Sequence, residues 1–256
     1  MLAAVLSVLF WVGIGVTSLL LFPIALLIWL VTVPFDRRLR LLHRFTCWWA
    51  SLYTWLNPIW RVHVVGRENI RPGATYVMVA NHLSFLDILV LFRLQRHFKW
   101  VSKAEMFRIP AIGWNMRLNR YVKLRRGDKN SIRQMMETCR KTLAEGSSLM
   151  IFPEGTRSPD GRLRAFKPGA FQLALEARVP ILPIVISGTA DALPKHGFVL
   201  RGHHEIGVRV LPEIPYESFA HLTVEQLTAR VHELYLRETG ELERVAAKQE
   251  DERRQA

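Results

Sequence analysis

The sequence predicts an α/β fold, a mostly parallel sheet flanked by helices, preceded by an N-terminal helical membrane anchor. Short apolar runs alternate with stretches of helical period, and polar clusters directly follow two of these runs. Residues 1–35 contain no charged side chain, whereas a membrane-spanning helix needs only about 20 apolar residues. A chain of 256 residues has room for one such domain and this appendage.

We divide the chain into a membrane anchor with an interfacial helix at residues 1–58, a domain at 59–240 and a charged tail at 241–256 that we expect to be disordered. Pro23 allows either one tilted helix or a hairpin that turns near Phe22 and enters one leaflet. A cleaved signal peptide is disfavoured because the apolar stretch is overlong and has no basic region before it.

Residues 37–56 combine arginines with Trp48, Trp49 and Trp55. Arginines beside an apolar segment favour the cytoplasmic side of a membrane, and tryptophans favour the headgroup level. We therefore expect a helix lying in the interface. The protein would be an integral membrane protein, of the cell inner membrane if it is bacterial, with its domain facing the cytoplasm.

Seven apolar runs predict strands, and four stretches predict helices. The strands are expected at residues 61–65, 76–80, 98–101, 121–124, 148–152, 181–186 and 206–211. The helices are expected at residues 84–94, 130–144, 169–177 and 223–238. Gly146 would end the second helix, and Thr223 with Gln226 forms a capping-box pattern at the start of the last one.

Composition limits the partners. The formal charge of +13 indicates an anionic partner, and the apolar N-terminus favours membrane lipid over nucleic acid. Two cysteines, Cys47 and Cys139, are too few and too far apart for a disulfide scaffold or a zinc site, so we expect no metal.

The first polar cluster places His82 and Asp87 just after the apolar run at residues 77–80. A histidine can act as a general base when a carboxylate holds its other ring nitrogen, and this spacing lets the two side chains fold back onto each other. The alternative is a helix cap, in which Asn81 or Ser84 caps the next helix and His82 is an ordinary turn residue.

The second cluster follows the apolar run at residues 149–151 and reads Phe-Pro-Glu-Gly-Thr-Arg-Ser over residues 152–158. Polar clusters at the ends of separate strands are typical of the way in which α/β enzymes assemble a site. The two clusters are therefore expected to meet.

Together, the Asn-His-x-Ser-x-x-Asp pattern at 81–87 and the second cluster resemble the glycerolipid acyltransferase family. Residues 103–110 with Gly113 are similar to the family's second block, and residues 179–184 are similar to its fourth. The resemblance covers roughly residues 60–215. It implies the family's glycerol-3-phosphate acyltransferase-like fold, and supporting roles for the motif residues Asn81, Ser84, Phe152, Pro153 and Pro183.

The resemblance implies transfer of a fatty acyl group to the hydroxyl of a lysolipid acceptor, with 1-acyl-sn-glycerol 3-phosphate as the expected acceptor and phosphatidic acid as the product. Acyl-CoA or acyl carrier protein would be the co-substrate, without a cofactor. His82 would be the base and Asp87 its orienting partner. Arg157 and Lys103 would contact the acceptor phosphate. Backbone amides of Glu154, Gly155 and Thr156 are candidate donors to the oxyanion.

Several alternatives stay open. The chain reads Leu-Arg-Arg at 124–126, where many phosphatidate-forming relatives carry Asp-Arg, so glycerol 3-phosphate or another lysolipid such as lyso-ornithine lipid could be the acceptor. A membrane esterase using Ser84 lacks the usual Gly-x-Ser-x-Gly elbow. A non-catalytic binder of anionic lipid would explain the charge but not the two clusters.

Overall fold

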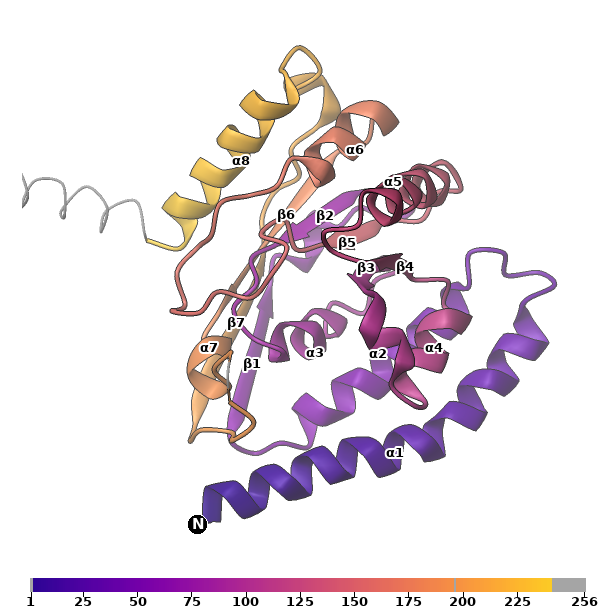
Figure 1. Cartoon of the computed structure of the whole chain (residues 1–256), viewed down its shortest axis with the longest axis vertical. Helices are drawn as coiled ribbons and strands as arrows, with labels where there is room; N and C mark the ends of the chain where they lie inside the picture. The colour runs from indigo at the N-terminus through magenta and orange to yellow at the C-terminus, as the bar shows by residue number, and fades with distance from the viewer. Residues whose placement is uncertain (1, 196, 241–256) are drawn as a thin grey trace, which may run out of the picture.

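The computed structural model describes residues 2–195 and 197–240, and the predicted disordered tail at 241–256 lies outside the described residues (Figure 1). Seven strands form one sheet in the order β1-β7-β6-β2-β5-β3-β4. The strands are β1 Trp60–Val65, β2 Val77–Ala80, β3 Lys99–Lys103, β4 Val122–Leu124, β5 Leu149–Ile151, β6 Ile181–Ser187 and β7 His204–Val210. Neighbouring strands are parallel except β6 and β7, so the predicted mostly parallel sheet is confirmed.

Helices cover both faces of the sheet. They are α1 Leu2–Thr32, α2 Arg40–Trp55, α3 Leu86–Phe92, α4 Ile112–Leu118, α5 Lys129–Ala144, α6 Gly169–Ala177, α7 Thr189–Ala192 and α8 Val224–Glu238. Side chains alternate between the two faces of β2: Met78 packs in the core that α2 and α3 cover, and Val79 packs in the core that α5, α6 and α8 cover. A strand with both faces buried reads as a continuous apolar run, which is why residues 77–80 stood out in the sequence.

Two helix starts show how local sequence fixes local structure. Thr223 and Gln226 form the predicted capping box at the start of α8. Asp128 caps α5 by accepting hydrogen bonds from the backbone N–H groups of Asn130 and Ser131. α3 begins at Leu86, two residues later than predicted, because the backbone N–H groups of Leu83 and Ser84 turn to the Asp87 side chain and these residues do not join the helix.

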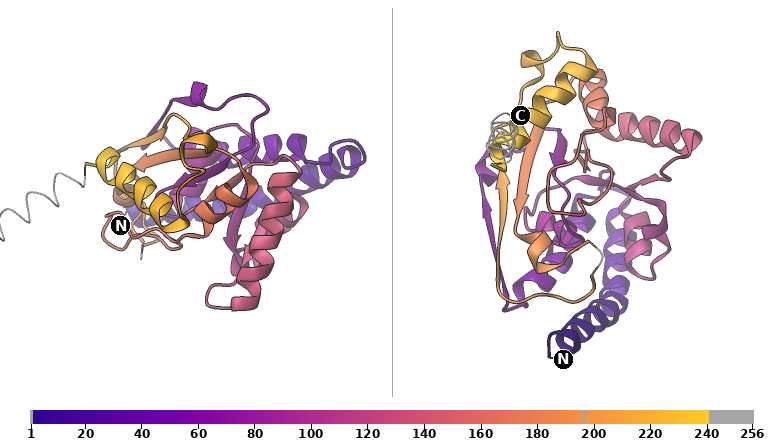
Figure 2. Two further views of the ribbon diagram at one scale, coloured as in Figure 1. Left: turned by 90° about the horizontal axis from the view of Figure 1, so that it is seen from above. Right: turned by 60° about the vertical axis from the view of Figure 1, so that its left-hand side comes forward.

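The N-terminal apolar segment forms one continuous helix, α1, with Pro23 inside it. The alternative of a hairpin turning near Phe22 is therefore wrong. Within the described residues, α1 is the one helix long and apolar enough to cross a membrane by length and composition, over Ala3–Thr32. Figures 1 and 2 show α1 lying along one side of the domain, with its N-terminal end near α7.

The side of α1 that faces the domain carries its polar residues. Ser7, Ser18 and Thr32 are buried, whereas the large apolar side chains on the other side are exposed. These small polar residues recur at helical spacing in an otherwise apolar helix. Their spacing could have identified, from the sequence, the side of the helix that faces the protein.

α2 confirms the predicted helix within residues 37–56, but its tryptophans do not share one environment. Trp48 and Trp55 are exposed, and Trp49 is 4% exposed, packed with Ala25 of α1 and with Leu42. Trp49 therefore packs inside the protein and does not face outward with the other two tryptophans. Its indole N–H instead donates a hydrogen bond of 2.7 Å to the hydroxyl of Tyr53.

Candidate active site

His82 follows the carboxyl end of β2 in the middle of the sheet. Asn81 ties this point to β6, because its side-chain amide donates to the carbonyl of Ile186 at 2.9 Å and accepts from the N–H of the same residue at 2.7 Å. The side chain thus extends the pairing of β2 and β6 by one step beyond the last strand residue. His82 leaves the strand from a rigid position.

Asp87 lies in the first turn of α3 and points back at His82. Its Oδ2 accepts hydrogen bonds from His82 Nδ1 at 2.8 Å and from the backbone N–H groups of Leu83 and Ser84 at 2.7 and 2.8 Å. Its Oδ1 accepts from the Thr189 hydroxyl at 2.5 Å. The carboxylate is fully buried, and these donors together compensate for the water it has lost.

The His82 ring is held on one face by Phe152 and at Nδ1 by Asp87. The Phe152 ring stacks on the imidazole with a centroid distance of 3.9 Å and an interplanar angle of 9°. Since Nδ1 bonds to Asp87, Nε2 is the ring nitrogen left to take a proton from a bound hydroxyl. The side chain lines the pocket described below and is the group that the predicted chemistry needs there.

Glu154 of the second cluster is hydrogen-bonded to His82 of the first, so it joins the two clusters. Its buried carboxylate accepts hydrogen bonds from the backbone N–H of His82 at 2.6 Å and of Arg164 at 3.1 Å. Burial raises the pKa of this carboxyl to about 7, against the lowering effect of the two N–H donors. The His82 carbonyl accepts in turn from the N–H of Ser158 at 2.8 Å. The two predicted clusters do meet, and the Glu154 side chain positions His82.

The turn after Glu154 requires glycine. Gly155 has a φ of +70°, and a Cβ there would lie 2.9 Å from Cε of Lys167. Its N–H donates to the Phe152 carbonyl at 3.0 Å, so this amide is engaged within the turn. Thr156 lines the pocket, and its amide stays a predicted oxyanion donor.

Other predicted support residues have structural contacts. Ser84 is buried, and its hydroxyl donates to the Leu193 carbonyl at 2.7 Å. The carbonyl of Pro153 accepts from the N–H of Lys167 at 2.8 Å, and that of Pro183 accepts from the N–H of Leu211 at 3.0 Å. These residues hold the strands and loops around the site.

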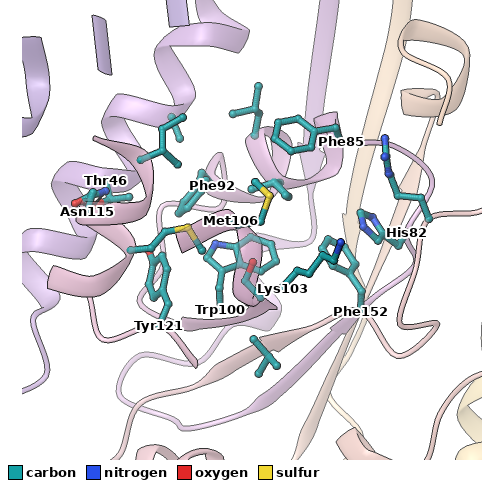
Figure 3. A pocket seen from close by; sticks show the side chains of 18 of the residues that line it. Thr46, His82, Phe85, Phe92, Trp100, Lys103, Met106, Asn115, Tyr121 and Phe152 are labelled. Carbon is teal, nitrogen blue, oxygen red and sulfur yellow. Dashed lines mark hydrogen bonds between the residues drawn. The ribbon is translucent and has the colours of Figure 1, made fainter. Parts of the chain in front are cut away.

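A pocket of about 400 Å³ opens beside His82 (Figure 3). Figure 3 shows His82, Phe152 and Lys103 at one end, Thr46 and Asn115 at the other, and Phe92, Trp100 and Met106 between them. Ile14 and Ser18 of α1 and Tyr53 of α2 also line it. Its interior is mainly apolar, which suits a hydrocarbon chain.

Four cationic residues line the same pocket: Lys103, Arg126, Arg157 and Lys195. Lys103 Nζ lies 3.8 Å from a carboxylate oxygen of Glu105, and both side chains are about half exposed. Among the described residues, no carboxylate lies within ion-pair distance of Arg157. Arg157 is therefore available to an incoming anion.

Sequence reasoning missed Thr189, which is fully buried and bonded to Asp87. It follows β6, the strand next to β2, so the rule that polar residues at strand ends form sites would have selected it. Gly188 makes the turn possible, because it has a φ of +79° and a Cβ there would lie 2.2 Å from the carbonyl oxygen of Glu205. The pocket-lining residues of α1 and α2 were also missed.

The fold and the site define a class of α/β protein in which a buried histidine–aspartate pair lies beside an apolar pocket at the carboxyl edge of a parallel sheet. A family profile described as Acyltransferase matches residues 61–187. The chain belongs to the acyltransferase family.

Named relatives and a solved structure agree with this placement. The chain is 41% identical over 196 residues to a 1-acyl-sn-glycerol-3-phosphate acyltransferase of Chlamydomonas reinhardtii, covering 76% of this chain and 58% of the relative. It is 35% identical over 175 residues to the human 1-acyl-sn-glycerol-3-phosphate acyltransferase alpha, covering 67% of this chain and 61% of the relative. The chain thus spans less than two thirds of the length of these two relatives.

The solved structure covers nearly the whole chain. The crystal structure of the 1-acyl-sn-glycerophosphate acyltransferase PlsC from Thermotoga maritima superposes with a TM-score of 0.74 at 25% identity. The match covers 94% of this chain and 98% of the other, so it extends beyond the domain predicted at residues 59–240.

Proposed function

We propose that this protein transfers a fatty acyl group from a thioester to the free hydroxyl of 1-acyl-sn-glycerol 3-phosphate, which gives phosphatidic acid. The observation that carries the proposal is the His82–Asp87 pair beside a mainly apolar pocket whose lining also includes Arg157. The activity in the names of the relatives supports the same assignment.

His82 acts as the general base. Nε2 takes the proton of the acceptor hydroxyl while the oxygen attacks the thioester carbonyl, and Asp87 stabilises the imidazolium that forms. The tetrahedral oxyanion accepts a hydrogen bond from a backbone amide, for which Thr156 is the candidate. The carbon–sulfur bond then breaks, the thiolate leaves, and the imidazolium returns a proton to it.

The remaining residues divide between the two substrates. Arg157 grips the acceptor phosphate with two parallel hydrogen bonds, and Lys103 is a second contact. The acyl chain of the donor occupies the apolar interior of the pocket. The donor is acyl-CoA or acyl carrier protein, and because the thioester is already activated no cofactor is needed.

α1 attaches the protein to the membrane. Near its start, Phe10 of α1 packs against Trp60, and the last turns of α1 pack against α2. The helix therefore lies along the domain, and its apolar side is free to contact lipid. We place this side in one leaflet. Arg37 and Arg38 follow directly, which favours the cytoplasmic leaflet.

The geometry disfavours the esterase alternative. A serine nucleophile must bond to the base and reach the substrate, whereas the hydroxyl of Ser84 is fully buried and points at the Leu193 carbonyl. The Ser84 side chain therefore has a structural role, which is to hold the segment around Leu193.

The test is an assay of the purified protein with a panel of acceptors: 1-acyl-sn-glycerol 3-phosphate, glycerol 3-phosphate and lyso-ornithine lipid, each with acyl-CoA and acyl carrier protein. We expect phosphatidic acid from the first acceptor and little free fatty acid. Release of free fatty acid without acylated product would instead indicate a hydrolase, and faster turnover of another acceptor would reassign the substrate.

A further inference from the structure

We propose that the exposed side of α5 beside the pocket is the docking surface for an acyl carrier protein, which delivers the acyl donor. The inference rests on the proposed function and selects between its two donors. The α5 basic surface, as we call it, comprises Lys129, Ile132 and Arg133 of α5 and, from the loop before α6, Arg164 and Lys167. Its occupant is a folded protein of net negative charge, as acyl carrier proteins are.

The cations of this surface lack ionic partners in the chain. Within residues 2–195 and 197–240, four exposed side chains lie beyond ion-pair distance of any carboxylate: Lys129, Arg133, Arg164 and Lys167. Two neighbouring carboxylates are engaged, since Asp128 caps α5 and Glu137 pairs with Arg140. A group of uncompensated like charges attracts an oppositely charged partner and orients its approach.

Cations at the opposite edge of the sheet are paired instead. Arg209 of β7 lies 2.6 Å from Glu238, and Arg61 of β1 lies 3.7 Å from Glu205. The unpaired charge at α5 is therefore a local property and not a uniform feature of the molecular surface.

The surface adjoins the mouth of the pocket. α5 begins three residues after Arg126, which lines the pocket. Lys167 lies over the turn at Gly155, where a Cβ would be 2.9 Å from its Cε, and the next residue, Thr156, lines the pocket. A partner bound to these cations is therefore positioned to insert its thioester arm beside His82.

The two parts of the surface meet each other. A Cβ at Gly169 would lie 3.8 Å from Sδ of Met136, so the start of α6 contacts the middle of α5. Lys167 precedes Gly169 by two residues, and Arg133 precedes Met136 by about one helical turn. The cations of the helix and of the loop therefore border the same contact and form one surface.

Ile132 gives this surface an apolar centre. Its side chain is 41% exposed, although it lies on the helix between Lys129 and Arg133. Protein interfaces combine an apolar centre with a charged rim, whereas phosphate groups need only cations and hydrogen-bond donors. Ile132 therefore favours a carrier protein over the nucleotide of CoA as the occupant.

α5 lies on the face of the sheet away from α1. Met136 and Cys139 of α5 pack in the same core as α6 and α8, whereas Phe10 and Trp11 of α1 pack against the core on the other face. Figure 2 shows α5 standing out from the domain, away from α1. With the apolar side of α1 in lipid, the α5 basic surface faces the aqueous phase, which favours a soluble carrier over an anionic membrane.

The test compares palmitoyl-acyl carrier protein with palmitoyl-CoA in steady-state kinetics of the full-length protein, with the acceptor in neutral detergent micelles. The charge-reversed variant Lys129→Glu/Arg133→Glu should raise the KM for the carrier-protein donor by about tenfold and leave kcat unchanged, because rim charges act on association. Its KM for palmitoyl-CoA should change by less than about twofold.

The matched control is Lys141→Glu/Arg178→Glu, which reverses two exposed cations in the last turn of α5 and just after α6. It should behave as the original protein with both donors. Ile132→Ser keeps the net charge and so separates direct contact from long-range attraction. It should raise the KM for the carrier-protein donor alone by about threefold to fivefold.

An unchanged KM for the carrier-protein donor in both test variants would overturn the inference. So would an equal rise for both donors, which would assign the cations to the phosphates of CoA, or a loss confined to phosphatidylglycerol vesicles and equal for both donors, which would assign them to the membrane. Phosphatidic acid formed from palmitoyl-CoA alone would overturn the inference and leave the proposed function intact. Phosphatidic acid from neither donor would overturn both.

Discussion

The Thr189 hydroxyl donates a hydrogen bond of 2.5 Å to Oδ1 of Asp87, and both residues are fully buried. The other oxygen of Asp87 takes the imidazole N–H and two backbone N–H groups. Thr189 thereby fixes the carboxylate so that only Oδ2 faces His82. Under the proposed mechanism we expect it to affect the reaction through Asp87, as a positioning residue.

Thr189→Val should therefore lower kcat by about tenfold to a hundredfold, the range expected for loss of a hydrogen bond to a charged group. The acceptor KM should change little, since the hydroxyl does not face the pocket. Thr189→Ser, which keeps the hydroxyl, should restore most of the rate. A valine variant with normal kcat, or a serine variant as slow as valine, would contradict the positioning role.

His82→Ala should reduce turnover by ~10² to 10⁴, the usual contribution of a general base. Binding of the lysolipid, measured separately, should remain because the pocket lining is otherwise unchanged. His63→Ala is the matched control: its exposed ring pairs with the exposed Glu205 side chain of β7, and neither residue lines the pocket. Near-normal turnover of His82→Ala would rule out the mechanism.

Arg157→Lys should raise the acceptor KM by about tenfold, because lysine keeps the charge but cannot make the planar two-bond contact with a phosphate. The donor KM should change less. Arg162→Lys, an exposed position on the same loop, serves as the control. Equal shifts in both Michaelis constants would assign Arg157 a structural role.

Deleting residues 1–35 should inactivate the protein toward soluble and membrane-borne acceptors alike. Ile14 and Ser18 line the pocket, and α1 covers buried Trp49 on α2, so the deletion opens the pocket and exposes apolar surface. Activity assays and thermal unfolding followed by circular dichroism measure both effects. A truncated protein with a normal melting temperature and full activity on a soluble acceptor would show that α1 is a separable anchor.

Acidification should destabilise the fold through two histidines, buried His43 of α2 and His97 just before β3. Burial lowers the pKa of His43 well below its usual value and that of His97 to about 3. Because the folded state binds these protons less readily than the unfolded chain, the stability they contribute is present above about pH 6.5 and is lost as pH falls toward 3. Nearby Lys99, Arg40 and Arg38 also lower the pKa of His97, and Asp36 opposes them.

The measurement is the free energy of unfolding by denaturant at several pH values between about 7.5 and 4.5. His97→Gln should show a weaker loss of stability on acidification than the original protein. His63→Gln, at an exposed site, should show the same loss as the original. If the free energy of unfolding of His97→Gln fell with pH as steeply as that of the original protein, the acid sensitivity would come from other groups.

The strands and the contact between His82 and Asp87 could be predicted from the sequence alone. The strands of the parallel core are recognisable because burial of both faces demands apolar residues at every position, as in β2. His82 and Asp87 are five positions apart and are joined through one turn, so their hydrogen bond depends on local backbone geometry that neighbouring residues encode. Such features need no knowledge of where distant segments lie.

The residues that complete the site from distant parts of the chain could be identified only from the packing of the folded protein. Thr189 reaches Asp87 because β6 pairs with β2, and Trp11 reaches the Phe198 carbonyl because α1 lies along the domain. An apolar helix can satisfy its hydrophobic surface in lipid or against protein, and composition alone does not distinguish the two. Packing separates the two sides of α1 here: Ser7 and Ser18 find hydrogen-bond partners on the protein side, and the large apolar side chains on the opposite side stay exposed.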